Sequence, residues 1–222
     1  MSNHTIFTKQ LAAASATNIA LLQTPGSAAL TLNGSTVAGG VATIDAASSA
    51  NLENGRRVII TSGGNDTGIN WTGVGTNSSG SVITDTFAGA SGGAAQSNLD
   101  FVTVTSITPS GAVATTAEAG TNGVGSSRWY TWNYYGFPPM NLSFAVEVVS
   151  GSVNYTVQYT QDDPNPLPGV IAPAFPLAFN TILVNQTTTA DATLSTPVLA
   201  TRVLINSGTG EIRCRFTQAG IG

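Results

Sequence analysis

The segment MNLSFAVEVVSGSVNYTVQYTQ, residues 140–161, predicts two β-strands. On either side of Ser150 and Gly151, apolar and polar residues alternate, which is the pattern of a half-buried strand. A two-residue loop at Ser150 and Gly151 predicts a hairpin with every apolar side chain on one face. A slip of one residue would destroy that match, so the register is also predicted. The expected pairs are Val148–Val153, Val146–Tyr155, Phe144–Val157 and Leu142–Tyr159.

The C-terminal segment TRVLINSGTGEIRCRFTQ, residues 201–218, alternates in the same way. A four-residue loop at 207–210 predicts a second hairpin, in which Cys214 faces inward as a small hydrophobic side chain. Arg213 and Arg215 then face the other way, as rim charges or as ion-pairing partners for acidic groups of a neighbouring subunit. The expected pairs are Ile205–Ile212, Val203–Cys214 and Thr201–Phe216.

The rest of the chain also favours strands, because short runs of Val, Ile and Thr are separated by Gly, Asn and Ser. The predicted class is all-β, an antiparallel sandwich of jelly-roll-like character with two β-subdomains. We expect an extended N-terminal arm over 1–26, a short helical turn being the alternative, a first β-domain over 27–125 and a second over 126–222. A Pro-rich surface loop is expected over 162–180, since proline cannot occupy a central strand. The expected strands of the first domain are 28–34, 39–46, 56–64, 69–76, 81–89, 100–111 and 112–120, with a longer loop at 89–100.

An aromatic segment, RWYTWNYYGF at residues 128–137, holds six of the sixteen aromatic residues of the chain. Six such rings offer roughly 1,000 Å² of apolar surface, more than a soluble monomer usually exposes in one patch. The segment is therefore a core with a domain interface, a contact between subunits, or a sugar-stacking site, and all three interpretations stay open. In a strand, Tyr130, Trp132 and Tyr134 share one face, and Trp129, Tyr135 and Phe137 share most of the other.

The composition excludes several classes of protein. Charged residues make up only 8% of the chain, and no apolar run approaches the roughly 20 residues of a membrane span. A single cysteine rules out an intramolecular disulfide, and the N-terminus lacks the basic start and apolar core of a secretion signal. These features predict folding in a reducing cytoplasm.

Binding of nucleic acids or phosphates has little support in the sequence. The net charge is −4 with one lysine, so no basic patch forms. The stretch GVGTNSSG, residues 73–80, lacks the lysine and the following helix of a phosphate loop and predicts a hairpin turn instead. Arg56 and Arg57 are expected to be solvated or rim charges.

Catalytic and metal-binding patterns are equally sparse. The one histidine, His4, lies near an end expected to be disordered, so a nucleophile such as Cys214 has no partner base. Asp162 and Asp163 end a strand before a turn and lack the repeated carboxylates of a calcium loop. The sequence therefore predicts a protein that is no enzyme, with no cofactor and no metal site.

Several stretches together resemble virion proteins of tailed bacteriophages and prophages. They are QLAAASATNIALLQTPGSAALTLNG (10–34), RRVIITSGGNDTGINWTGVGTNSSGSVITDTFAGA (56–90), the segment from 100 to 163 that includes the aromatic segment, and VLINSGTGEIRCRFTQAGIG (203–222). The resemblance covers nearly the whole chain, rests on turn and strand patterns, and brings no catalytic residues.

The resemblance implies a structural component of a phage particle that is assembled in the bacterial cytoplasm and located in the virion. Capsid decoration is the first expectation and a tail or fibre-attachment subunit the second. The partners would be other virion proteins and further copies of the chain, a trimer being one candidate form. The alternative is a carbohydrate- or receptor-binding module that uses Trp129, Trp132 and Tyr134 with Asn133 or Asp162. A glycan-degrading enzyme is the weakest reading.

Overall fold

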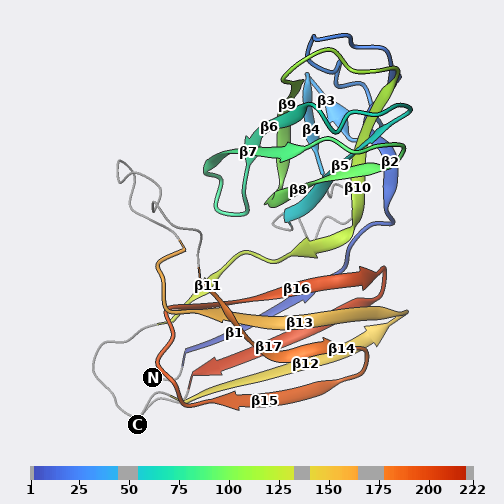
Figure 1. Ribbon diagram of the computed structural model, residues 1–222. Coiled ribbons are helices and arrows are strands. Elements are labelled where there is room, and N and C mark those ends of the chain that lie inside the picture. The colour runs from blue at the N-terminus through green and yellow to red at the C-terminus, as the bar shows by residue number, and fades with distance from the viewer. Residues whose placement is uncertain (1–2, 45–54, 133–140, 165–177, 219–222) are drawn as a thin grey trace. The chain divides into compact units, whose positions relative to one another are not determined.

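The computed structural model describes residues 3–44, 55–132, 141–164 and 178–218 (Figure 1). These residues form strands and no helix, and their strand pairs are antiparallel, which confirms the all-β class. The chain divides into two compact units. We call Met1–Gln10 with Ser127–Gly222 the C-terminal unit and Leu11–Ser126 the N-terminal unit.

The first 26 residues do not form a separate arm. Strand β1 (Asn3–Lys9) pairs with β17 (Glu211–Gln218) in the C-terminal unit. Strand β2 (Ser15–Gln23) pairs with β10 (Ala117–Ser126) in the N-terminal unit. Both segments form backbone hydrogen bonds with a neighbouring strand, whereas the backbone groups of a free arm would bond to water. The division after Ser126 lies beside the predicted boundary at 125.

Two sheets form the C-terminal unit (Figure 1). One has the strand order β1–β17–β12–β15, with β12 at Leu142–Ser150 and β15 at Ala190–Leu194. The other joins β14 (Asn180–Gln186), β13 (Val153–Thr160) and β16 (Ala200–Gly208), and the short β11 (Tyr130–Thr131) pairs with β16. The core residues come from both sheets and include Leu142, Phe144, Val146, Tyr155, Val157, Val203, Ile205, Cys214 and Phe216.

Both predicted hairpins are wrong in their pairing. Strand β12 pairs with β15 and β17, whereas β13 pairs with β14 and β16. The turn at Ser150 and Gly151 therefore carries the chain from one sheet to the other, and residues 209–210 carry it back between β16 and β17. The predicted strands and inward faces are present, because alternation selects the buried face of a strand without selecting its neighbour.

The two crossing turns lie against each other. The Gly210 N–H donates a hydrogen bond of 2.8 Å to the Ser152 carbonyl oxygen. Gly151 and Gly208 have φ angles of 69° and 91°, in the region that favours glycine. A Cβ at Gly208 would lie 2.3 Å from the Ser152 carbonyl oxygen, so any side chain at this position would clash with that oxygen.

The N-terminal unit also consists of two sheets around its own core. One has the order β3–β4–β9–β6–β7, and the other joins β2, β10, β5 and β8. The strands not yet placed are β3 (Val37–Ala38), β4 (Val41–Thr43), β5 (Gly55–Ser62), β6 (Asn70–Thr76), β7 (Val82–Ala88), β8 (Ala94–Phe101) and β9 (Thr103–Pro109). Both sheets supply the core, which includes Ile19, Val58, Ile60, Trp71, Phe87, Phe101, Val104 and Ile107.

Sequence patterns located most strands of this unit. Strands β4, β6, β7 and β9 fall within predicted segments, β5 begins one residue before its own, and β6 and β7 form the expected hairpin. Its turn is closed by the Asn77 side chain, whose oxygen accepts the Ser79 and Ser81 N–H groups at 3.0 Å each. Two predictions are wrong: residues 28–34 form no strand, and the expected loop at 89–100 contains most of β8. Alternating Ala, Ser and Leu with Gln, Asn and Asp in β8 give too weak an apolar signal.

Candidate functional site

The aromatic segment begins inside the core of the C-terminal unit. The Tyr130 ring stacks on Phe7 with 4.3 Å between the ring centroids, and Phe216 meets it edge-on at 6.5 Å. Trp132 is only 5% exposed, and its indole N–H donates a hydrogen bond of 3.0 Å to the buried Thr201 hydroxyl. Tyr130 and Trp132 therefore share an inward face, as their spacing predicted, and serve as core.

Trp129 has the opposite orientation and is half-buried. The Arg202 guanidinium lies 4.6 Å from the Trp129 ring centroid and 5.7 Å from that of Phe179, which is 48% exposed. The Arg202 Nε donates a hydrogen bond of 2.8 Å to the Gln158 side-chain oxygen. We call Trp129, Arg202 and Phe179 the aromatic–arginine cluster. The remaining predicted rings, Tyr134, Tyr135 and Phe137, lie outside the described residues, as does Asn133.

Side-chain amides continue from this cluster along strands β13 and β16. The Asn206 amide nitrogen lies 2.7 Å from the Asn154 oxygen and 3.0 Å from the Asn185 oxygen. Residues 154 and 158 share one face of β13, and 202 and 206 share one face of β16, because side chains alternate with a period of two. We call Asn154, Asn185 and Asn206, together with the buried Gln158, the amide strip. Asn185 has a φ of 51°, the only non-glycine positive value among the described residues.

Asp162 has a local structural contact. Its carboxylate accepts the Ala178 N–H at 2.8 Å, and the Thr160 hydroxyl donates to the Ala178 carbonyl at 2.7 Å. These two bonds hold together the ends of the Pro-rich segment. Asp162 therefore ends its strand and starts the connection, as predicted.

Arg213 and Arg215 lie on the outer face of the sheet formed by β1, β17, β12 and β15. Both reach the same carboxylate oxygen of Glu147, at 3.5 Å and 3.0 Å. Their side chains are 40% and 45% exposed, so these ion pairs add little stability. Cys214 between them is fully buried, as the alternation predicted.

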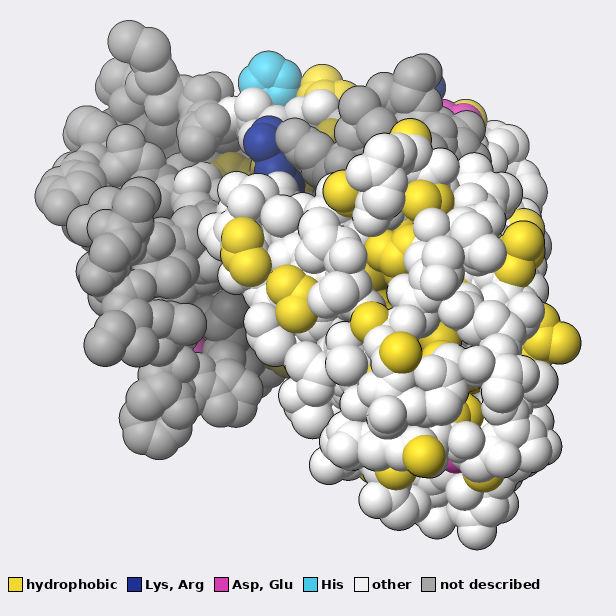
Figure 2. Space-filling model, turned by 90° about the horizontal axis from the view of Figure 1, so that it is seen from above, with side chains coloured by type: hydrophobic (Ala, Val, Ile, Leu, Met, Phe, Trp, Pro, Cys, Tyr) yellow, Lys and Arg dark blue, Asp and Glu magenta, His cyan; other side chains and the backbone are white. Residues whose placement is uncertain are grey.

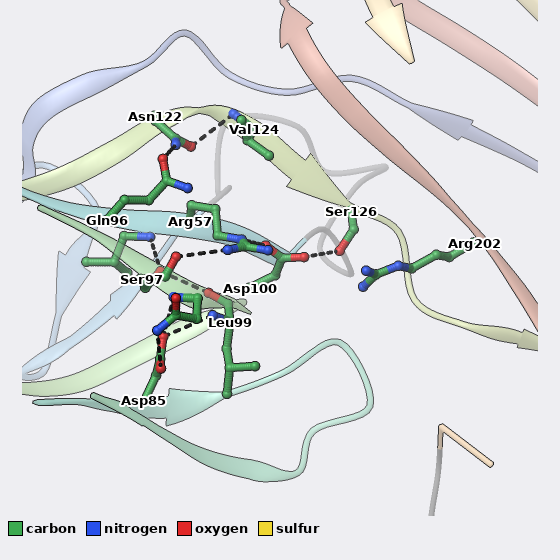
Figure 3. Close-up of polar contacts among 12 residues, drawn as sticks. Arg57, Asp85, Gln96, Ser97, Leu99, Asp100, Asn122, Val124, Ser126 and Arg202 are labelled. Atoms are coloured by element: carbon green, nitrogen blue, oxygen red, sulfur yellow. Dashed lines mark hydrogen bonds and ion pairs between the residues drawn. The ribbon is translucent and has the colours of Figure 1, made fainter. Parts of the chain in front are cut away.

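The prediction of solvated arginines at 56 and 57 is wrong for Arg56, which is fully buried and donates to the Asn122 carbonyl. The Arg57 Nε donates to the Asp100 carboxylate at 2.5 Å, and the Ser126 hydroxyl donates to the other oxygen of Asp100 at 2.7 Å (Figure 3). These groups link β5, β8 and β10 inside the N-terminal unit. The sequence does not show that the hydrogen-bond partner of Arg56 lies 66 residues away in the chain, so this arginine resembles an exposed charge.

Asp85 joins the two sheets of the N-terminal unit (Figure 3). One of its carboxylate oxygens accepts the Asn98 N–H at 2.5 Å and the Leu99 N–H at 2.9 Å. The carboxylate is buried and bound to backbone, as expected for a structural group. This contact fixes β7 against β8.

Burial raises the pKa values of two side chains in the C-terminal unit. Burial raises the pKa of the Cys214 thiol, which therefore stays protonated and unreactive near neutral pH. Burial also raises the pKa of Tyr155 to about 12, and its hydroxyl donates a hydrogen bond of 2.9 Å to the Thr188 carbonyl. His4, expected in a disordered end, lies in β1 opposite Thr217.

On the face seen in Figure 2, most described atoms belong to the backbone or to uncharged polar side chains, with hydrophobic side chains among them and few charged ones. Within the described ranges, no three His, Cys, Asp or Glu side chains gather as metal ligands. Those ranges also contain no helix long and apolar enough to span a membrane. No family model, curated protein or solved structure matches the chain.

The functional candidates that sequence reasoning missed are Arg202, Phe179 and the amide strip. Alternation in β13 and β16 would have placed Gln158, Arg202 and Asn206 on the faces opposite the apolar core residues, although Gln158 is itself buried. It could not show that these strands are neighbours, because both were assigned to other partners.

Proposed function

We propose that this protein is a non-enzymatic structural component of a tailed-bacteriophage particle, as a capsid decoration protein first and a tail or fibre-attachment subunit second. The resemblance of its strand and turn patterns to virion proteins supports this assignment. Its all-β architecture and its neutral polar surface suit a subunit that packs beside others, where unpaired buried charges would be costly.

The observation that carries the proposal is the aromatic–arginine cluster. Tryptophan and arginine dominate the residues that contribute most to protein–protein binding. Arg202 is held by the Gln158 side chain and by two rings, so little side-chain entropy is lost on binding. A neighbouring virion protein would bury the exposed part of Phe179 and Trp129 and use the guanidinium as a fixed donor.

Cosedimentation with particles that lack this chain tests the proposal. Purified wild-type protein should bind such particles saturably, and Trp129→Ala or Phe179→Ala should weaken binding at least about tenfold. Val82→Ala is the matched control, because Val82 is an apolar side chain 75% exposed on the N-terminal unit. Wild-type protein that stays in the supernatant, or cluster variants that bind like the control, would contradict the proposal.

The second candidate is a carbohydrate-binding module, and the amide strip is the observation that favours it. Amide side chains carry a donor and an acceptor and suit the paired hydroxyls of a sugar, while exposed rings suit its apolar face. With Trp132 in the core, the stacking groups of this candidate become Trp129 and Phe179. Tryptophan fluorescence titrated with host surface glycans tests it: saturable quenching that Asn206→Ala abolishes supports sugar binding, and an unchanged signal counts against it.

A further inference from the structure

The outer face of the β1–β17–β12–β15 sheet has a regular arrangement of charges. One row crosses all four strands: Ile6 pairs with Arg215, Arg215 with Ala145, and Ala145 with Asp191. The next outward row contains Arg213 beside Glu147. We call Ala145, Glu147, Asp191, Arg213 and Arg215 the charged face. The alternate residues of these strands, such as Phe144, Val146 and Cys214, are buried in the core.

The two signs of charge lie on opposite sides of β12. Arg213 and Arg215 share the single carboxylate of Glu147, which leaves an excess of positive charge around these two residues of β17. Asp191 on β15 is exposed and forms no ion pair with any described residue. Strands lie about 4.8 Å apart, so Arg215 and Asp191 lie about 10 Å apart with Ala145 between them.

We propose that a second copy of this chain packs on the charged face, about a two-fold axis that runs along β12. This axis exchanges the two sides of the strand, so Arg215 of each copy faces Asp191 of the other. Ala145 lies on the axis, and its small side chain lets the two sheets approach to the roughly 10 Å of face-packed sheets. Arg213 then faces the neutral Thr189 position of the other copy.

Charge balance favours this occupant. In the region where the two copies overlap, each brings two arginines, Glu147 and Asp191, so this part of the joint face holds equal numbers of positive and negative groups. The two Glu147 carboxylates meet near the axis, where each already accepts from two arginines of its own chain. Glu211, at the end of β17, lies beyond the end of β15 in the other copy and faces no charge of its own sign.

The area of the charged face indicates how tightly the two copies should bind. About this axis three strands of each copy, β17, β12 and β15, lie opposite the other copy, and at about seven residues each they offer roughly 330 Å² per copy. Two copies then cover about 660 Å², below the range of stable specific interfaces. The dimer should therefore be weak and dependent on concentration, and salt should weaken it further because its contacts are half-exposed charges.

Sedimentation velocity from low micromolar to submillimolar concentration tests the inference with two charge reversals. In Arg215→Asp, two aspartates face each other across the interface, and in Asp191→Arg, two arginines do. Each variant alone should dimerise at least about tenfold more weakly than the wild type. An equimolar mixture should regain the dimer, because each mixed pair again sets aspartate against arginine at both contacts.

Thr84→Asp is the matched control, since it adds a negative charge to an exposed position of β7 in the N-terminal unit. It should dimerise like the wild type, and circular dichroism should show that all variants keep their strands. If Arg215→Asp fails to fold, Asp191→Arg on the edge strand decides alone and must dimerise at least about tenfold more weakly than the wild type. A monomeric wild type, reversals without effect, or a mixture that stays monomeric would overturn the inference. None of these outcomes depends on the particle to which the protein belongs.

Discussion

Trp129 and Trp132 are three positions apart, and the structure predicts opposite consequences for their loss. Trp132→Ala removes a buried indole and leaves the Thr201 hydroxyl, itself fully buried, without its donor. Truncation of a buried tryptophan costs about 3–5 kcal/mol. Trp129→Ala loses a half-exposed ring and its contact with Arg202, for which about 1 kcal/mol is the expected scale.

Urea denaturation followed by far-ultraviolet circular dichroism measures this difference. The unfolding transition of the C-terminal unit should move strongly in Trp132→Ala and little in Trp129→Ala. Trp132→Phe should fall between them, at about 2 kcal/mol, because the ring is mostly retained while the hydrogen bond is lost. The N-terminal unit, with its own buried Trp71, serves as the internal reference. A Trp132→Ala protein as stable as Trp129→Ala would refute the placement of Trp132 in the core.

Replacing Gly208 by Ala sets a Cβ 2.3 Å from a carbonyl oxygen of the adjacent turn, so urea unfolding should show a loss of about 3 kcal/mol. Ala at Gly80, where φ is 77° and no atom lies within 4 Å, should cost only about 1 kcal/mol, and equal losses would contradict the close approach. Because burial raises the pKa of Tyr155 to about 12 and also raises that of Cys214, both groups stabilise the fold while protonated. Their contribution is complete below the unfolded-state pKa values of about 8.5 for the thiol and about 10 for the phenol, and it is lost as pH rises through them. Unfolding measured from pH 8 upward should show this loss, and Tyr155→Phe should reduce it above about pH 10; an unchanged pH dependence would count against burial of the phenol. Asp100→Asn leaves the Arg57 guanidinium without its counter-charge. The substitution should lower the melting temperature and cost about 2 kcal/mol of stability. An unchanged melting temperature would contradict the ion pair.

The sequence was most informative about which residues face inward. Alternation placed Phe144, Tyr155 and Cys214 in the core and the flanking arginines outside, because burial of one face follows directly from the period of a strand. It predicted the wrong neighbours, since a turn such as Ser150–Gly151 can join two strands within one sheet or in two facing sheets. The same apolar faces are buried in both cases, so hydrophobic pattern does not separate them.

The candidate site depends on that missing information. The amide strip and the aromatic–arginine cluster form only because β13 lies beside β16, and the charged face only because β17 lies between β1 and β12. The prediction fails for Arg56 for a related reason, since its partner Asn122 is distant in sequence. Long-range pairing is set by the whole fold, whereas alternation within a strand and turn residues between strands are local patterns.

Quantitative mass spectrometry of purified phage particles tests the structural role most directly, through the number of copies of this chain relative to the major capsid protein. We predict that the chain is present in a fixed ratio. A ratio on the scale of the capsid lattice would assign it to decoration, and one on the scale of a tail ring would assign it to the tail. Absence of the chain from purified particles would contradict the account.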